Sequence, residues 1–172
     1  MPTPTLVLED GSGLTNSNAY ADVSEADAYH DAHLYASTWI AATTANKTIA
    51  LIWATRILDE QAEWKGSKAH DTQALRWPRT DVLDPDGVEL AGDAIPTWLK
   101  AATSECARVL LSTDRTAESD KAGLKQVTVG PITLIVDPLT ELPILPRSVI
   151  SILQPYARIK GLKTGWVKLL RV

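Results

Sequence analysis

Residues 95–110, IPTWLKAATSECARVL, are the stretch that most clearly predicts how this chain folds. Apolar side chains recur there every three or four residues, at Ile95, Trp98, Leu99, Ala102, Cys106, Val109 and Leu110. Because an α-helix repeats about every 3.6 residues, this spacing places them on one helical face. Pro96 stands near the first turn, where proline is favoured. We therefore expect an amphipathic helix whose apolar stripe, including Cys106, faces a core.

Helical periodicity predicts three further helices. They are expected over residues 24–34, over residues 45–64 and from Pro146 onward, with Pro155 kinking the last one or ending it early. Residues suited to the start of a helix stand at Ser24, at Thr43 or Thr44, and at Pro146. The second of these helices has a wide apolar face, formed by Ile49, Ile52, Trp53, Leu58 and Ala62.

Strand-like segments are fewer and shorter. Residues 127–129 and 132–136 are separated by Gly130-Pro131, which predicts either a hairpin or one bent strand. Asp84-Pro85-Asp86-Gly87 predicts the tight turn of another small hairpin. We therefore expect a mainly α protein, a small bundle of about four helices with a minor β element near residues 126–136. Residues 1–160 would form this body, and residues 161–172 an extended basic C-terminal tail.

Length and composition are those of a single globular domain. The chain has 172 residues, of which 45% are hydrophobic and 22% charged, and this balance argues against disorder. No apolar run approaches the roughly 18 residues of a membrane-spanning helix. Residues 1–5 lack the basic and apolar segments of a secretory signal. The single cysteine excludes a disulfide within the chain. We therefore expect no membrane partner.

Charge is distributed unevenly along the chain. Residues 1–141 carry 21 acidic and 11 basic side chains, a net charge of −10. Residues 142–172 carry six basic side chains and no acidic one. A basic C-terminal segment can contact nucleic acid, an anionic membrane or an acidic protein surface, or remain a solvated extension. The acidic body argues against nucleic-acid binding over the main surface, because phosphate contacts need lysine and arginine.

Motifs for catalysis or cofactor binding are weak. Gly11-Ser12-Gly13 is not followed by the lysine of a phosphate-binding loop. Two histidines with helical spacing have two aspartates nearby: His30, His33, Asp27 and Asp31. Such a group could bind a metal, but an ordinary solvated or partly buried helix face is the favoured interpretation because further ligands are missing. We therefore expect that the protein is not an enzyme and that it has no cofactor and no metal site.

Six tryptophans offer candidate contact residues. Trp53 and Trp98 lie on helical apolar stripes, so we expect them in the core. Trp77 is flanked by Arg76 and Arg79 and is the best candidate for base stacking or for an interface. Trp166 lies in the basic C-terminal segment, where a tryptophan outside the core would serve as an anchor.

Several segments, taken in order, resemble a family of phage proteins. They are Glu9-Asp10-Gly11-Ser12-Gly13-Leu14, Asn18-Ala19-Tyr20, Ala26-Asp27-Ala28-Tyr29-His30, Trp64-Lys65-Gly66, Gln73-Ala74-Leu75-Arg76-Trp77-Pro78-Arg79, Gly92-Asp93-Ala94-Ile95-Pro96, Val129-Gly130-Pro131-Ile132 and Val167-Lys168-Leu169-Leu170-Arg171. The family is labelled DnaT-like single-stranded-DNA-binding protein. The chain is also similar to the head–tail connector adaptors of tailed bacteriophages.

The adaptor resemblance implies a mostly helical structural protein in the neck of the virion. Such adaptors form a dodecameric ring under the portal protein, bind a tail-side neck, stopper or tail-tube protein, and continue the channel for DNA packaging and ejection. Double-stranded genomic DNA then passes through the lumen without specific binding. The protein would be made in the cytoplasm of the host bacterium. The expected portal contact is the C-terminal tail, formed by Gly161, Leu162, Lys163, Gly165, Trp166, Val167, Lys168, Leu169, Leu170, Arg171 and Val172.

Charge favours the adaptor over the strand binder at the level of sequence. A sequence-independent strand binder presents a basic groove lined with aromatic side chains. A ring around passing DNA gains instead from an acidic lumen that does not hold phosphates. Between the two functions that the resemblance implies, the net charge of −10 over residues 1–141 favours the head–tail adaptor, and single-stranded-DNA binding is the alternative.

Overall fold

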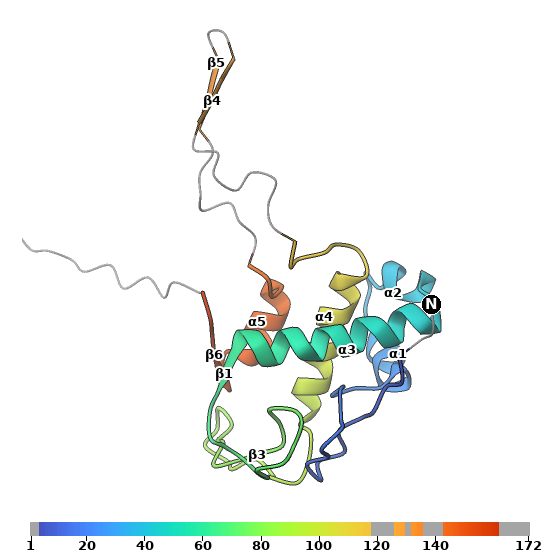
Figure 1. Cartoon of the computed structure of the whole chain (residues 1–172), viewed down its shortest axis with the longest axis vertical. Coiled ribbons are helices and arrows are strands. Elements are labelled where there is room, and N and C mark those ends of the chain that lie inside the picture. Colours follow the sequence, from blue (N-terminus) through green and yellow to red (C-terminus); the bar gives the residue numbers. More distant parts are fainter. Residues whose placement is uncertain (1–3, 118–125, 130–131, 136–142, 162–172) are drawn as a thin grey trace, which may run out of the picture.

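The computed structural model describes residues 4–117, 126–129, 132–135 and 143–161. Five helices lie in these residues: α1 Val23–Asp31, α2 Ser37–Ala41, α3 Thr44–Gln61, α4 Thr97–Leu110 and α5 Arg147–Leu153 (Figure 1). The prediction of a mainly α protein agrees with the structure at this coarse level. The helix that periodicity did not predict is α2, whose five residues are too few to show a repeat.

Strands form three two-stranded antiparallel sheets in the described residues. The paired strands are β1 Ala62–Trp64 with β6 Ala157–Ile159, β2 Ser67–Lys68 with β3 Arg79–Thr80, and β4 Gln126–Val129 with β5 Ile132–Ile135. Val129 pairs with Ile132, so the expected β element is a hairpin and not one bent strand. The expected turn at residues 84–87 is also present, with the Asp84 amide donating to the Val88 carbonyl at 2.8 Å.

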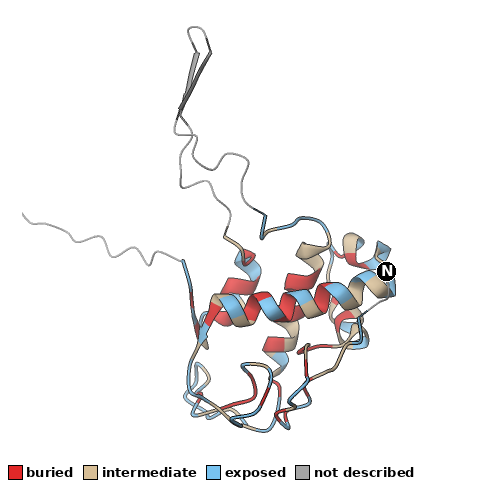
Figure 2. Cartoon of the chain, viewed as in Figure 1, coloured by how far each residue is buried: buried red, intermediate tan, exposed pale blue. Residues whose placement is uncertain are grey.

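Helix α4 is the centre of the core. It packs against α3, α5 and α1. Of its predicted apolar stripe, Ile95, Leu99, Ala102 and Cys106 are buried, and Trp98, Val109 and Leu110 are partly buried. Leu99 and Ala102 are fully buried, and Figure 2 shows buried residues concentrated where the helices face one another. Burial raises the pKa of the Cys106 thiol to about 12, so this cysteine stays protonated and serves as a small apolar side chain.

Helix α1 starts differently from the prediction, whereas the start of α3 agrees with it. Asp22, and not Ser24, caps α1: its carboxylate accepts from the Glu25 amide at 2.8 Å, and the Glu25 carboxylate accepts from the Asp22 amide at 3.1 Å. This reciprocal pair is a complete capping box, which stabilises the start more than Ser24 would. Of the two predicted caps of α3, Thr43 and Thr44, the structure has Thr43, whose hydroxyl accepts from the Asn46 amide.

Helix α3 ends before the predicted Trp64. Residues 62–64 leave the helix and pair with β6, so the backbone hydrogen bonds of this segment go to a strand almost a hundred residues later. The predicted burial of Trp53 is also wrong, because this side chain is 39% exposed. The face of α3 that packs inward is formed by Ala50, Leu51, Ala54, Thr55, Ile57 and Leu58.

A buried carboxylate organises the N-terminal loop. Glu9 is fully buried and accepts from the amides of Gly11 and Gly13 at 3.1 and 2.9 Å. It also accepts from the Leu14 amide at 3.0 Å and the Ser17 hydroxyl at 2.7 Å. Gly11 has a φ of +104°, and a Cβ atom there would lie 2.1 Å from a backbone oxygen, so only glycine fits.

We expect Glu9→Gln to destabilise the protein by about 2–3 kcal/mol, because an amide group cannot accept all of the donors that converge on a buried carboxylate. Urea unfolding would measure the loss. Asp10→Asn is the matched control, since the Asp10 carboxylate is exposed and bonds only to Ser12. Equal effects of the two substitutions would show that the Glu9 hydrogen bonds do not organise the loop.

Candidate nucleic-acid interface

The segment around Trp77 is placed differently from the prediction. Trp77 is fully buried, with its ring centroid 5.9 Å from that of Trp64 and 5.3 Å from that of Trp98. It therefore cannot stack on a base or contact a partner unless the core opens. The expectation of an exposed tryptophan is corrected: the flanking arginines do not keep this ring at the surface.

Arg79 is buried as well, for a structural reason. Its guanidinium group donates to the carbonyl oxygens of Lys65, Gly66 and Arg76 at 2.7, 2.6 and 3.1 Å. Three of the five N–H donors of the guanidinium group are therefore engaged by backbone acceptors, which fixes this side chain within the protein. Arg76, by contrast, is exposed. A contact of Arg76 with a partner stays a prediction. Arg79 connects the residues that precede β2, Lys65 and Gly66, to Arg76, which precedes β3.

A surface pocket of about 550 Å³ lies beside α3 and includes Arg76. Its walls come from α3, from residues 17–18, from residues 74–76 and from the end of β6. The lining residues are Ser17, Asn18, Ile52, Trp53, Thr55, Arg56, Asp59, Glu60, Ala74, Leu75, Arg76 and Lys160. A pocket of this size can hold a nucleobase with its sugar and phosphate.

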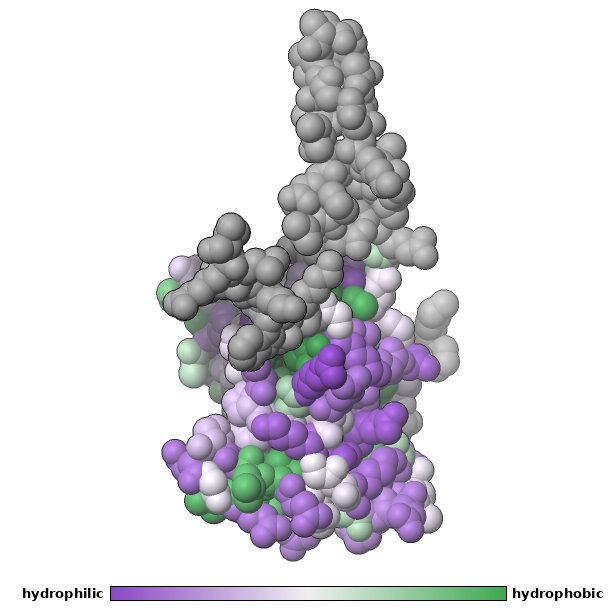
Figure 3. All heavy atoms as spheres, turned by 90° about the vertical axis from the view of Figure 1, so that its left-hand side faces the viewer, coloured by the Kyte–Doolittle hydropathy of each residue, from purple (hydrophilic) through white to green (hydrophobic). Residues whose placement is uncertain are grey.

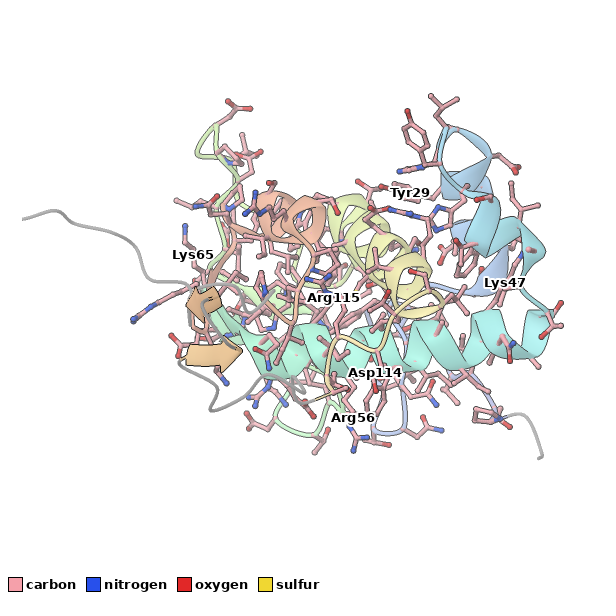
Figure 4. The ribbon with its side chains drawn as sticks, turned by 90° about the horizontal axis from the view of Figure 1, so that it is seen from above. Tyr29, Lys47, Arg56, Lys65, Asp114 and Arg115 are labelled. Atoms are coloured by element: carbon pink, nitrogen blue, oxygen red, sulfur yellow. The ribbon has the colours of Figure 1, made fainter. Side chains whose placement is uncertain are left out.

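Trp53 and Arg56 form an exposed aromatic and cationic pair in this pocket. They stand one helical turn apart on α3, and the guanidinium carbon of Arg56 lies 5.5 Å from the Trp53 ring centroid. Figure 4 shows Arg56 on the side of α3 that faces away from α4 and α5. Arg56 also makes a 3.4 Å ion pair with the exposed Glu60, a weak contact that solvent screens. The pair therefore offers an aromatic face and a cation at one place.

Asp59 fastens α3 to the segment that carries Arg76. One carboxylate oxygen accepts from the Tyr20 hydroxyl at 2.7 Å and the other from the Arg76 amide at 3.0 Å. The Tyr20 hydroxyl in turn accepts from the Arg76 and Trp77 amides, each at 3.1 Å. Burial raises the pKa of Asp59 to about 6, although these hydrogen bonds oppose the shift. Asp59 thus sets the position of Arg76 at the pocket.

The small polar side chains of the pocket already have partners within the protein. Ser17 donates to Glu9 at 2.7 Å, and Asn18 donates to the Thr5 carbonyl at 2.9 Å. Thr55 donates to the carbonyl one turn earlier at 3.0 Å. Few side-chain groups remain to read the edge of a base, so recognition here would depend on stacking and charge.

Charge in the pocket differs from that of the body as a whole. Three cationic side chains line it, from Arg56, Arg76 and Lys160, against the carboxylates of Asp59 and Glu60. Lys160 donates to the Glu60 carbonyl at 2.8 Å, which keeps its ammonium group at the rim. The pocket therefore carries a small positive excess on a chain whose formal net charge is −4.

The remaining predicted site residues lie elsewhere or outside the described residues. His30 is buried, with Nε2 3.1 Å from the Ser104 carbonyl oxygen. Within the described ranges, no group of three His, Cys, Asp or Glu side chains could hold a metal ion, and no helix is long and apolar enough to cross a membrane. Gly161 is the last described residue. The rest of the predicted portal contact, residues 162–172, lies outside the described ranges, and this contact stays a prediction.

The fold and the pocket define a small, mainly helical protein with a cationic, aromatic surface site. A family model described as "Putative DnaT-like ssDNA binding protein" matches residues 4–166, and the chain belongs to this family. No curated protein and no solved structure matches the chain significantly. The match supports the predicted family, and no match concerns a phage head–tail adaptor.

One feature of the sequence could have indicated this pocket: charged residues that share a helical face with Trp53. Arg56 and Glu60 follow Trp53 at three and seven positions, a spacing that puts all three residues on one side of a helix. Charged residues on the same face as a tryptophan indicate an exposed face. Arg76 and Lys160 come from distant segments, and no local pattern places them there.

We expect the Asp59 carboxyl to make stability depend on pH. Because its pKa is raised to about 6 in the folded state, protonation stabilises the fold, and this contribution is lost as the pH rises through 6. Between pH 7 and pH 5 the wild type should gain about 1 kcal/mol of unfolding free energy relative to Asp59→Asn. Urea unfolding at several pH values measures the difference.

The matched control is Glu60→Gln, which removes the neighbouring exposed carboxyl. The difference between wild type and Glu60→Gln should change little over the same pH range. A pH-independent difference between wild type and Asp59→Asn would show that the pKa of Asp59 is not raised.

Proposed function

We propose that this protein binds single-stranded DNA, with little sequence preference, through the pocket on α3. The observation that carries the proposal is the exposed Trp53 ring beneath Arg56, in one pocket with two further cations, Arg76 and Lys160. Membership of the family described as "Putative DnaT-like ssDNA binding protein" supports it. Single-stranded-DNA binding, which was the alternative at the level of sequence, is therefore better supported than the head–tail adaptor.

Each part of the pocket has a role in such binding. A base stacked on tryptophan contributes about 1–3 kcal/mol whatever its identity, because every base has a π-face. Arg56, Arg76 and Lys160 would bind the phosphates on either side of the stacked base. Since the pocket's small polar side chains are already hydrogen-bonded within the protein, discrimination between bases is weak.

The acidic body limits how much DNA the protein contacts. With a net charge of −10 over residues 1–141, most of the surface repels phosphates. The positive pocket then confines the strand to a short site. We therefore expect modest affinity that falls as salt screens or replaces the few cationic contacts.

We expect Trp53→Ala to weaken binding of a labelled dT oligonucleotide about tenfold or more, because the stacking face is lost. Arg76→Gln should lower the slope of log affinity against log salt by about 0.7, the value for one phosphate contact. Fluorescence anisotropy at several salt concentrations measures both effects.

Tyr35→Ala and Arg147→Gln are the matched controls, because each removes an exposed side chain of the same kind outside the pocket. Both should bind like wild type. Equal losses for pocket and control variants, or no binding by the wild type at low salt, would overturn the proposal.

A second candidate function is the head–tail adaptor, and exposed apolar side chains favour it. Leu34, Tyr35 and Ile40 are 87%, 74% and 68% exposed around α2. Leu83 and Val88 are 55% and 62% exposed beside the turn at 84–87. These two patches lie toward opposite ends of the described body (Figure 1). Figure 3 shows apolar patches bordered by hydrophilic residues on the face seen from the left of Figure 1.

Two unlike patches at opposite ends are what a closed ring needs. A ring repeats one contact between two different surfaces, so the α2 patch of one copy would meet the turn patch of the next. In this function the ring sits under the portal protein in the virion, and residues 161–172 contact the portal. The ring copy number of twelve comes from the family resemblance.

We expect an adaptor to form a complex of fixed stoichiometry with the portal protein of its phage, measured by mass photometry. Tyr35→Ser and Leu83→Ser should each reduce that complex, because each makes one of the two patches polar. Trp53→Ser, outside both patches, is the control. A portal complex unaffected by either patch variant would contradict the proposed ring contact, and no portal complex would contradict the adaptor function.

A further inference from the structure

The exposed face of β6 carries cationic side chains onward from the α3 pocket. Lys160, which lines the pocket, directly follows β6, and Arg158 stands two residues earlier within the strand. Because successive side chains of a strand point to opposite faces, Arg158 and Lys160 share one face. Burial follows this alternation: Ala157 and Ile159 are buried, whereas Arg158 and Lys160 are exposed. The cationic edge of the pocket therefore extends along the outside of β6.

Pairing with β1 fixes this face in place. Glu63 is the direct cross-strand partner of Arg158. The Lys160 amide donates to the Gln61 carbonyl at 2.9 Å, which continues the pairing past the end of β6. The opposite face of the sheet, which includes Ile159, belongs to the hydrophobic core. Backbone hydrogen bonds and core packing thus set the positions of the two cations.

The guanidinium group of Arg158 is available to a ligand. Its side chain is 86% exposed, and within the described residues its polar contact is an ion pair with Glu63, at 3.9 Å between Nη1 and Oε2. The Glu63 side chain is 54% exposed, and an ion pair between two exposed side chains contributes at most about 1 kcal/mol. The buried Arg79, by contrast, is fixed by three backbone carbonyls. A phosphate can therefore displace Glu63 from Arg158 easily.

The spacing of the two cations suits a nucleic-acid strand. Two residues of a β-strand advance about 7 Å, which separates the backbone positions of Arg158 and Lys160. The phosphates of one stacked strand follow one another about every 3.4 Å along its axis, and an extended strand spaces them more widely. The two cations can therefore bind phosphates that are one or two nucleotides apart. On this face they stand against one carboxylate, Glu63, so the face attracts phosphates although the body as a whole is acidic.

We propose that a single strand bound in the α3 pocket continues along the outer face of β6, where Arg158 binds a phosphate one or two nucleotides beyond the phosphate at Lys160. The inference rests on the proposed function and adds the path of the strand, which the pocket alone does not give. Glu63 limits the affinity, because its carboxylate competes with the phosphate for Arg158 and repels the strand.

The experiment uses the full chain and two substitutions on the exposed face of the sheet, Arg158→Gln and Glu63→Gln. Arg147→Gln and Glu89→Gln are the matched controls, since each removes an exposed side chain of the same kind outside the pocket and outside this sheet. Labelled dT oligonucleotides of about 4 and about 12 nucleotides are titrated at several salt concentrations by fluorescence anisotropy. Urea unfolding of each variant checks that its stability is unchanged, as expected for exposed side chains.

On the longer oligonucleotide, Arg158→Gln should lower the slope of log affinity against log salt by about 0.7, the value for one phosphate contact. Glu63→Gln should raise the affinity about threefold at low salt, and this gain should fade as salt screens the carboxylate. On the shorter oligonucleotide, whose few phosphates the three cations of the pocket can hold, both variants should differ from wild type much less. The control variants should bind both oligonucleotides like wild type.

The outcomes separate this inference from the proposed function. If Trp53→Ala loses binding while Arg158→Gln binds both oligonucleotides like wild type, the strand does not follow β6 and the pocket proposal stands. Equal losses of salt slope for Arg158→Gln and Arg147→Gln would show a general effect of charge and would overturn the assigned path. If the wild type binds neither oligonucleotide, the proposed function itself fails, and this inference fails with it.

Discussion

The carboxylate of Asp59 connects the long helix α3 to the segment on which both the core and the surface site depend. It accepts hydrogen bonds from Tyr20 and from the Arg76 amide, and Tyr20 also accepts from the Trp77 amide. These bonds hold two successive residues in opposite roles: Trp77 fills the core, and Arg76 lies at the pocket. Burial disfavours the ionised form of the Asp59 carboxylate, and its pKa is therefore raised to about 6.

Local patterns predicted the elements whose cause is local. The stripe of α4 follows from helical periodicity, and Leu99 and Cys106 are buried where that stripe places them. The hairpin of β4 and β5 follows from two strand-like runs around one break. The end of α3 could not be predicted in this way. Residues 62–64 form a strand because they pair with β6, which lies far along the chain.

Two tryptophans show why the site was harder to predict than the fold. Sequence placed Trp53 in the core and Trp77 at the surface, and the structure reverses both. An apolar run on a helix does not say which side packs inward, and α3 turns its smaller and aliphatic side chains to the core. Flanking arginines suggested an exposed Trp77, but Arg79 uses its donors on three backbone carbonyls, which only the folded chain brings together.

The acidic surface of the protein attracts DNA weakly, and this affects both candidate functions, the strand binder and the head–tail adaptor. An acidic body cannot hold nucleic acid over a large area, so a strand binder of this composition has to concentrate its cations, as Arg56, Arg76 and Lys160 do around Trp53. A channel protein needs the same weak attraction over most of its surface, so that DNA passes. What distinguishes the two functions is therefore the small cationic pocket: a DNA channel has no need of an exposed tryptophan beneath an arginine, whereas sequence-independent strand binding depends on that pair.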